Sequence, residues 1–425
     1  MPPCPHCHIA LVTVNNAPPW CERCEFNLGL MEPEPEDGFI ARHINVWAAR
    51  MAFSANRKLF GELAGHTASK PDVNAAFVLL FGISIYVMCA LLATLAAGIY
   101  LVVTGHIVLQ VLGAILVGLA IVLRPRLGTM KPFRENFDEI TATDTPAMFA
   151  LIERAVHEMG APMPHHVFLS DEWNASASVV GLRRRRVLVI GVPLWICLQP
   201  QERVALLGHE LGHFVNRDVR RGLLTQPACT IFAQLADLVR PERIVHADGE
   251  GEGFGGGSFF AMLGMAIMKP FLWTAFYLFV LLHIAITAVA ARATQRAEYF
   301  ADAIALRLAG SRAMMFVDLL TNVEQLTTVV GARSRNGEGF AGWRKGIEET
   351  RIRRSETRIR LFQLSMRDDA SLFSTHPPAG YRYRMATTLP YAEPVIVLTE
   401  SEAATIDMEL SKFEQRYARE IAHSW

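Results

Sequence analysis

Residues 200–217 read PQERVALLGHELGHFVNR, and they determine how the rest of the chain is interpreted. Beyond Pro200 the apolar residues recur with helical spacing, so one helix is expected. His209 and His213 are four residues apart and project from the same helical face, where both imidazoles can bind one zinc ion. Glu210 follows directly and can act as a base toward water at that ion. The stretch predicts a zinc site, although so short a motif also arises by chance.

A zinc ion that takes part in catalysis needs a third protein ligand and an open fourth position. The best candidate lies in residues 295–302, QRAEYFAD, where Glu298 and Asp302 are again four residues apart. From one helical face Glu298 can reach the zinc, and Asp302 can hold the rear nitrogen of a ligand histidine. Taken alone, such an acid pair is usually a solvated helix face. Its meaning therefore depends on the motifs around it.

The composition points to a membrane protein. Of 425 residues, 51% are apolar and 19% charged, and the mean hydropathy is +0.24, which is too apolar for an ordinary soluble chain. Lys and Arg number 41, as do Asp and Glu, so no global positive field exists to attract nucleic acid. We therefore expect the lipid bilayer as a partner and no nucleic acid.

Residues 73–123 contain no Asp, Glu, Lys or Arg. One membrane crossing needs about 20 residues, so the run predicts a transmembrane hairpin with helices near 76–97 and 107–123 and a turn at 104–106. The nearby basic residues on either side are Arg57, Lys58, Lys70, Arg124, Arg126, Lys131 and Arg134. Because the turn has none, the positive-inside rule predicts that both ends face the cytoplasm. A buried hairpin in a soluble protein is the alternative.

A second apolar region, residues 258–291, has Lys269 as its only charged residue. If His209 and Glu298 bind one zinc, the chain between them must cross the bilayer an even number of times. In a four-span arrangement, residues 222–239 form a weaker additional span. In the alternative, residues 259–268 and 271–291 form a re-entrant hairpin that turns at Lys269-Pro270. We expect four spans, because ten residues are short for full membrane depth.

The N-terminal residues 1–31 contain two Cys-x-x-Cys pairs, Cys4 with Cys7 and Cys21 with Cys24. Two such pairs supply four thiolates for one structural zinc, and so short a segment needs the metal to fold. A zinc ribbon is therefore predicted; unrelated or disulfide-bonded thiols and rubredoxin-type iron are the alternatives. Residues 32–72 follow as an acidic, proline-rich spacer and a basic amphipathic stretch. That stretch suits a membrane surface or a packed linker helix equally well.

Residues 124–425 are expected to form the catalytic domain. Within it, residues 146–159 have an amphipathic helical pattern, and residues 167–169, 176–180 and 187–190 have the composition of short strands. The predicted fold class is α+β, mainly helical, with a small sheet beside the zinc-binding helices.

Four motifs occur in an order that resembles a known family. They are Asn174-Ala175-Ser176-Ala177, the motif from His209 to His213, the segment from Glu298 to Asp302, and Ser374-Thr375-His376-Pro377-Pro378 with Arg382. Together, over roughly residues 147–389, they resemble the integral-membrane zinc metalloproteases of the HtpX and CAAX prenyl endoprotease group. The hairpin suits the bacterial HtpX branch, whereas the zinc ribbon lies outside the resemblance.

The resemblance implies a zincin-like fold and a role for each motif residue. His209, His213 and Glu298 would bind zinc, Glu210 would be the general base, and Asp302 would orient a ligand histidine. His376 and Arg382 would lie near the reaction centre, although residues 379–383 lack the acidic residues common there. An edge strand that carries Asn174, Ala175, Ser176 and Ala177 would pair with peptide substrates.

The expected function is that of a zinc endopeptidase anchored by several spans in a bacterial cytoplasmic membrane, with its active site facing the cytoplasm. Recognition of substrate backbone would suit damaged or unassembled membrane proteins. Two alternatives remain. One is a dedicated processing protease for lipidated substrates, and the other is a membrane adaptor that works through its zinc ribbon.

Overall fold

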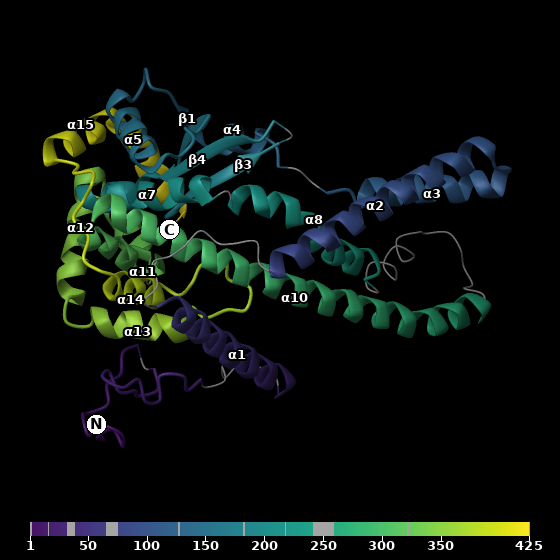
Figure 1. The fold of residues 1–425 in the computed structure, drawn as a ribbon, viewed down its shortest axis with the longest axis horizontal. Helices are drawn as coiled ribbons and strands as arrows, with labels where there is room; N and C mark the ends of the chain where they lie inside the picture. The colour runs from purple at the N-terminus through teal and green to yellow at the C-terminus, as the bar shows by residue number, and fades with distance from the viewer. Residues whose placement is uncertain are drawn as a thin grey trace. The chain divides into compact units, whose positions relative to one another are not determined.

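The described part of the chain is mainly helical with a small sheet, as predicted (Figure 1). The computed structural model describes residues 2–15, 17–31, 39–64, 75–125, 128–181, 183–216, 218–240, 259–320 and 323–424. These form two compact units. The first comprises residues 1–72, 128–219 and 294–425, and the second comprises residues 73–127 and 220–293.

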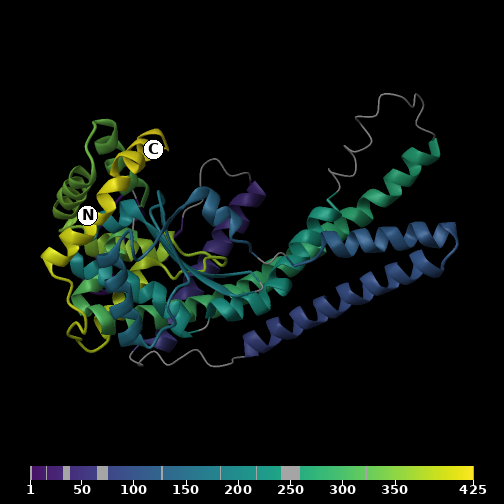
Figure 2. The same cartoon turned by 90° about the horizontal axis from the view of Figure 1, so that it is seen from above.

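The second unit contains the predicted hairpin. Helices α2 (Ala75–Thr104) and α3 (Ile107–Val122) run antiparallel and side by side (Figure 2). Large apolar side chains along both helices are exposed, among them Tyr100 at 66% and Val103 at 74%, as expected of a surface that faces lipid. Of the described helices, α2 and the part of α10 from Met268 to Ala309 are long and apolar enough to cross a membrane, whereas α3 is shorter.

Residues 220–238 of α8 (Asp218–Leu238) and residues 259–293 of α10 (Phe259–Ala309) complete this unit. Leu80 of α2, Ala228 of α8 and Ile286 of α10 pack into one buried cluster. Helix α10 continues without a break through Pro270. The re-entrant interpretation, which required a turn at Lys269-Pro270, is therefore wrong. Helix α8 is not among the apolar candidate spans, so its crossing of the bilayer stays a prediction.

The first unit contains the sheet. Its strands are β1 (Asp138–Ile140), β2 (His166–Ser170), β3 (Ala175–Val180) and β4 (Arg185–Gly191), in the order β1-β2-β4-β3. Strand β2 pairs parallel with β4, and β3 pairs antiparallel with β4 at the edge. The sequence predicted β2, β3 and β4 but not β1. The predicted helix at 146–159 is α5 (Pro146–Met159), which ends at Gly160 in the left-handed conformation with φ 61°.

Helix α7 (Pro200–Asn216) is the central helix of the first unit and is almost entirely buried. A Cβ atom at Gly208 would lie 3.0 Å from the Ala305 Cα, and one at Gly212 would lie 3.2 Å from the Ala301 Cα. Helix α7 and the C-terminal end of α10 therefore pack closely against each other, because each helix has two small residues, four positions apart, at the contact. The other helices of the first unit are α4 (Lys131–Asn136), α6 (Val192–Cys197), η1 (Ser311–Leu320), α11 (Val323–Arg335), α12 (Phe340–Arg354), α13 (Arg358–Asp368), α14 (Ala379–Thr388), α15 (Glu400–Leu410), η2 (Ser411–Phe413) and α16 (Glu414–Ser424).

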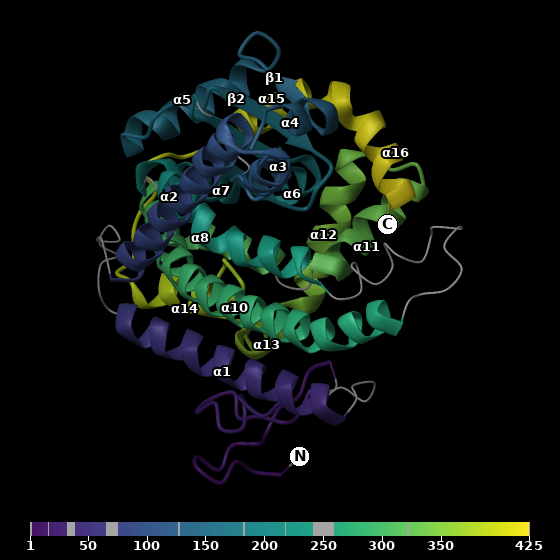
Figure 3. The same cartoon turned by 90° about the vertical axis from the view of Figure 1, so that its right-hand side faces the viewer.

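The N-terminal segment and helix α1 (Phe39–Leu63) also belong to the first unit, next to α13 and α14 (Figure 3). Leu59 of α1 is buried, and Phe60 packs on Tyr381 with ring centroids 5.3 Å apart. The C-terminal half of α1 therefore fits the packed-helix interpretation. Trp47, nearer the start of α1, is 61% exposed.

Candidate active site

The close approach of α7 and α10 brings the three predicted zinc ligands together. His209 Nε2 lies 3.4 Å from one carboxylate oxygen of Glu298, and His213 Nε2 lies 3.5 Å from the other. All candidate ligand atoms of the three residues lie within 4.8 Å of one another. Atoms bound about 2.1 Å from a tetrahedral zinc are about 3.4 Å apart, so this donor set fits the ion.

Asp302 and Arg382 hold His209 from behind. Asp302 Oδ1 is 2.9 Å from His209 Nδ1, and Arg382 donates two hydrogen bonds to the Asp302 carboxylate, of 2.6 and 2.9 Å. All three side chains are buried. With Nδ1 engaged in this way, Nε2 is left to face Glu298 and a metal. The predicted orienting role of Asp302 is consistent with this geometry.

The surroundings of His209 favour positive charge. Burial and the Arg382 guanidinium both act to lower the pKa of His209, but hydrogen bonds with Asp302 and Glu298 outweigh them and raise it to about 10. The buried carboxylates of Glu298 and Asp302 thus place negative charge beside both ring nitrogens of His209.

A cavity of about 250 Å³ opens beside the ligands, and Glu210 forms part of its wall. His376 stands at the rim with its side chain 60% exposed, and its Nδ1 lies 2.7 Å from Glu298 Oε2. Arg382 also lines the cavity, but its hydrogen bonds go to Asp302, and its Nη2 lies 3.3 Å from His209 Nδ1. These contacts favour a positioning role for Arg382 over direct contact with substrate.

The predicted substrate-binding segment lies at one edge of this cavity. Asn174 and Ala175 line it, whereas Ser176 and Ala177 continue along β3 and pair with Val189 and Leu188 of β4. Among the described strands none pairs with the outer edge of β3. Backbone groups along that edge can therefore pair with an extended peptide.

Apolar side chains complete the cavity wall, and the sequence did not point to them. Trp173 directly precedes the Asn174 motif and could have been included with it. Leu206 lies on the helix of the zinc motif, one turn before His209. The others come from segments without a recognisable signal, and they are Leu194, Phe316, Leu320 and Val323.

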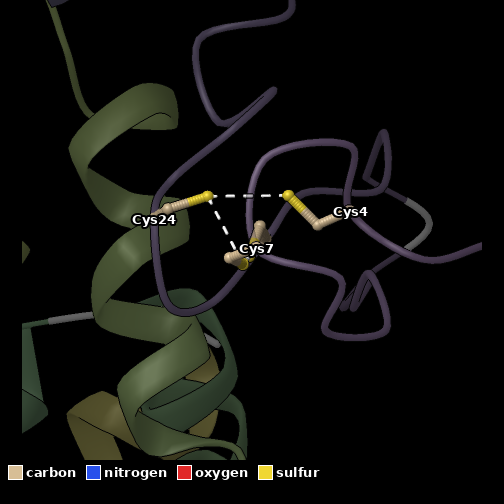
Figure 4. Close-up of side chains that lie close together, drawn as sticks. Cys4, Cys7 and Cys24 are labelled. Atoms are coloured by element: carbon tan, nitrogen blue, oxygen red, sulfur yellow. Dashed lines mark hydrogen bonds between the residues drawn. The ribbon is translucent and has the colours of Figure 1, made fainter.

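The four N-terminal cysteines form a separate cluster. Cys4 and Cys24 Sγ are 3.6 Å apart, Cys7 and Cys21 Sγ 3.3 Å, and Cys7 and Cys24 Sγ 3.8 Å, with three of them pointing together in Figure 4. Thiolates bound about 2.3 Å from a tetrahedral zinc are about 3.8 Å apart, so the cluster fits a structural zinc site. The interpretation as four unrelated thiols does not agree with this geometry.

Comparison with known proteins agrees with the geometry. The model of peptidase family M48 matches residues 143–389. An HtpX protease homologue of Desulforapulum autotrophicum is 24% identical over 248 residues, covering 57% of this chain and 69% of that protein. A homologue from Syntrophobacter fumaroxidans is 28% identical over 254 residues (58% and 77%), and protease HtpX of Chromohalobacter salexigens is 27% identical over 243 residues (56% and 69%). No solved structure matches significantly. The chain belongs to peptidase family M48 and is an HtpX-type membrane metalloprotease.

Proposed function

We propose that this chain is a zinc endopeptidase that cleaves extended segments of damaged or unassembled membrane proteins at the cytoplasmic face of the membrane. The observation that carries the proposal is the buried cluster of His209, His213 and Glu298, which adjoins a cavity lined by Glu210. The outer edge of β3 at the same cavity supports binding of an extended backbone. The basic residues that flank the hairpin support the cytoplasmic orientation.

His209, His213 and Glu298 would hold the zinc, and a second zinc would be held by Cys4, Cys7, Cys21 and Cys24. When bound at the active site, zinc supplies Lewis-acid chemistry that acidifies water and polarises a peptide carbonyl. Glu210 takes the proton from the attacking water and returns it to the leaving amine.

The remaining site residues bind and orient. Asn174 and Ala175 align the substrate backbone beside Glu210. His376, partly exposed next to Glu298, is placed to stabilise negative charge on the substrate carbonyl oxygen. Arg382 keeps Asp302 in place, and Asp302 keeps His209 in the orientation that binds metal.

Damaged or unassembled membrane proteins are favoured as substrates over lipid-modified ones. A dedicated enzyme for lipid-modified chains would need a large chamber enclosed by many spans. The described residues include two candidate spans, α2 and the apolar part of α10, and the shorter α3. An adaptor that works only through its zinc ribbon would not need a complete set of zinc ligands and base in the M48 domain.

The test is cleavage of an unfolded membrane protein by the purified full-length chain in detergent. We expect cleavage to stop when a chelator removes the metal and to return when zinc is added back. Cleavage that continues in protein shown to contain no metal would contradict the proposal. A lipid-modified peptide cleaved in strong preference to the unfolded protein would favour the processing alternative.

A further inference from the structure

The N-terminal zinc ribbon buries its largest apolar side chain in an apolar cluster of the first unit, and this cluster includes sequence neighbours of active-site residues. Trp20, directly before Cys21, is fully buried, and Leu28 is 1% exposed. Both belong to one packed cluster that also contains Tyr299 and Tyr381. The other buried members of this cluster are Leu59, Leu364, Met366 and Met385.

The two tyrosines are next to site residues in the sequence. Tyr299 follows the predicted zinc ligand Glu298, and Tyr381 precedes Arg382, which holds Asp302. Because a densely packed core transmits displacement, a change in this cluster acts on the backbone that carries both side chains. The ribbon is therefore connected to the catalytic site through packed atoms.

Polar contacts fix the ribbon in this position. Trp20 Nε1 donates a buried hydrogen bond of 2.9 Å to Gln363 Oε1, and Gln363 Nε2 donates one of 2.7 Å to the Glu22 carbonyl oxygen. Arg360 pairs with the Glu22 carboxylate at 3.0 Å, and Arg384 pairs with Glu25. All the ribbon residues in these contacts lie in or next to the second Cys-x-x-Cys pair.

The N-terminal segment has a small interior of its own. Its own core consists of Cys4, Leu11 and Cys21, with Cys7 and Phe26 packed against it, so most of the interior is formed by the thiols themselves. In such small zinc modules the free energy of metal binding is the free energy of folding. Loss of metal would therefore free Trp20 and Leu28 from the cluster.

We propose that the zinc ribbon is a metal-dependent clamp on the protease, in which Trp20 and Leu28 act as positioning residues for Glu298 and Arg382. This inference rests on the proposed peptidase function. Peptide cleavage then requires both zinc ions, one at the active site and one at the ribbon. An adaptor or substrate-binding module would instead present its apolar residues to a partner.

Leu28 and Leu30 offer a matched pair of variants in the full-length chain. Leu28 is buried in the cluster, whereas Leu30 is 38% exposed. We expect Leu28→Ala to lower kcat at least tenfold with little change in KM, and to release the active-site zinc at least tenfold faster to a chelator. Leu30→Ala should stay within twofold of wild type in both measurements. Trp20→Ala should resemble Leu28→Ala, and Trp20→Phe should recover most of the loss.

Metal content and melting temperature complete the experiment. Wild type should contain two zinc ions per chain, and a Cys21→Ser/Cys24→Ser variant should contain one. The melting curve of this variant should show that its first unit is still folded. Its cleavage activity should fall as it does in Leu28→Ala. The proposal is overturned if Leu28→Ala and the cysteine variant both cleave, and release zinc, within twofold of wild type. Failure of the proposed peptidase function can be told apart from failure of the clamp. In the first case wild type with two zinc ions would not cleave the substrate. The rates of zinc release from wild type and Leu28→Ala would still show whether the ribbon stabilises the active site.

Discussion

Glu298 and Asp302 are both buried acids on the same helix, yet they face different partners. Glu298 offers its two oxygens to His209 and His213, at 3.4 and 3.5 Å. Asp302 instead joins His209 Nδ1 to Arg382. A direct ligand contributes a bond to the metal, whereas an orienting partner contributes only through that ligand's alignment. The two residues should therefore differ in how strongly they affect zinc binding.

Glu298→Ala is expected to abolish zinc binding at the active site, because it removes one of three ligands. Asp302→Ala should retain the metal with an affinity lowered about 10–100-fold, and Asp302→Asn, which keeps a hydrogen-bond acceptor, should be milder. Zinc affinity is measured by competition with a chromogenic chelator in a background without the ribbon cysteines. Equal zinc occupancy in Glu298→Ala and its parent would remove Glu298 from the ligand set.

At the scale of elements, the site depends on how closely α7 approaches α10. Gly208 and Gly212 on α7 contact Ala305 and Ala301 on α10. Side chains larger than these would push the helices apart and move Glu298 away from the histidines. The glycines between and before the histidines therefore matter as much for the site as the ligands.

Gly208→Ala places a methyl group 3.0 Å from the Ala305 Cα and should destabilise the chain by about 1–3 kcal/mol. It should also weaken zinc binding at the active site. Gly222→Ala on α8 is the control, since a Cβ there meets no atom within 4 Å. That change should be neutral or stabilising by about 0.4–1 kcal/mol. Melting temperatures in detergent that fall equally for both variants would contradict the close-contact account.

Several elements could be predicted from local sequence. Helix α5 matches the predicted residues 146–159, because its amphipathic pattern and its terminal Gly160 agree. Strand β1 was missed, since Asp138–Ile140 is three residues long and carries two acids, which give no strand pattern. The unbroken course of α10 was not settled by sequence either, because Pro270 can end or merely bend a helix.

The residues of the site that belong to sequence motifs could be predicted. The contacts that position them through packing could not. The ligand residues follow from helical spacing and from the order of the motifs. Burial of Trp20 beside Tyr299 and Tyr381 joins segments far apart in sequence, and no local pattern encodes such a contact. The same holds for Phe316 in the cavity wall. The role of Arg382 changed for a related reason, since its partner Asp302 is known only from the fold.

At the scale of the whole molecule, the membrane topology must agree with the metal site. His209 on α7 precedes α8, and Glu298 follows the apolar part of α10. If both residues bind one zinc ion, they must lie on the same side of the bilayer. Two crossings between them satisfy this condition, with residues 222–239 as the first and 271–291 as the second. Residues 241–258, which connect them, lie outside the described part of the chain.

Cysteine labelling in intact cells tests this arrangement. In a Cys89→Ser background, cysteines introduced at Gly253 and Gly105 should react with an impermeant thiol reagent from outside. A cysteine at Ala341, exposed in the first unit, should react only after the cells are opened. Protection of residue 253 together with labelling of residue 105 would contradict four spans. Labelling of residue 341 from outside would contradict the cytoplasmic orientation.

The most direct test of the central claim is Glu210→Gln in the full-length chain. Glutamine cannot accept the proton of the attacking water, yet the substitution leaves His209, His213 and Glu298 in place. We predict that the variant keeps its active-site zinc, measured by metal analysis, and loses about 10²–10⁴-fold in the rate of cleavage of an unfolded membrane protein. Cleavage at the wild-type rate by zinc-loaded Glu210→Gln would contradict the account.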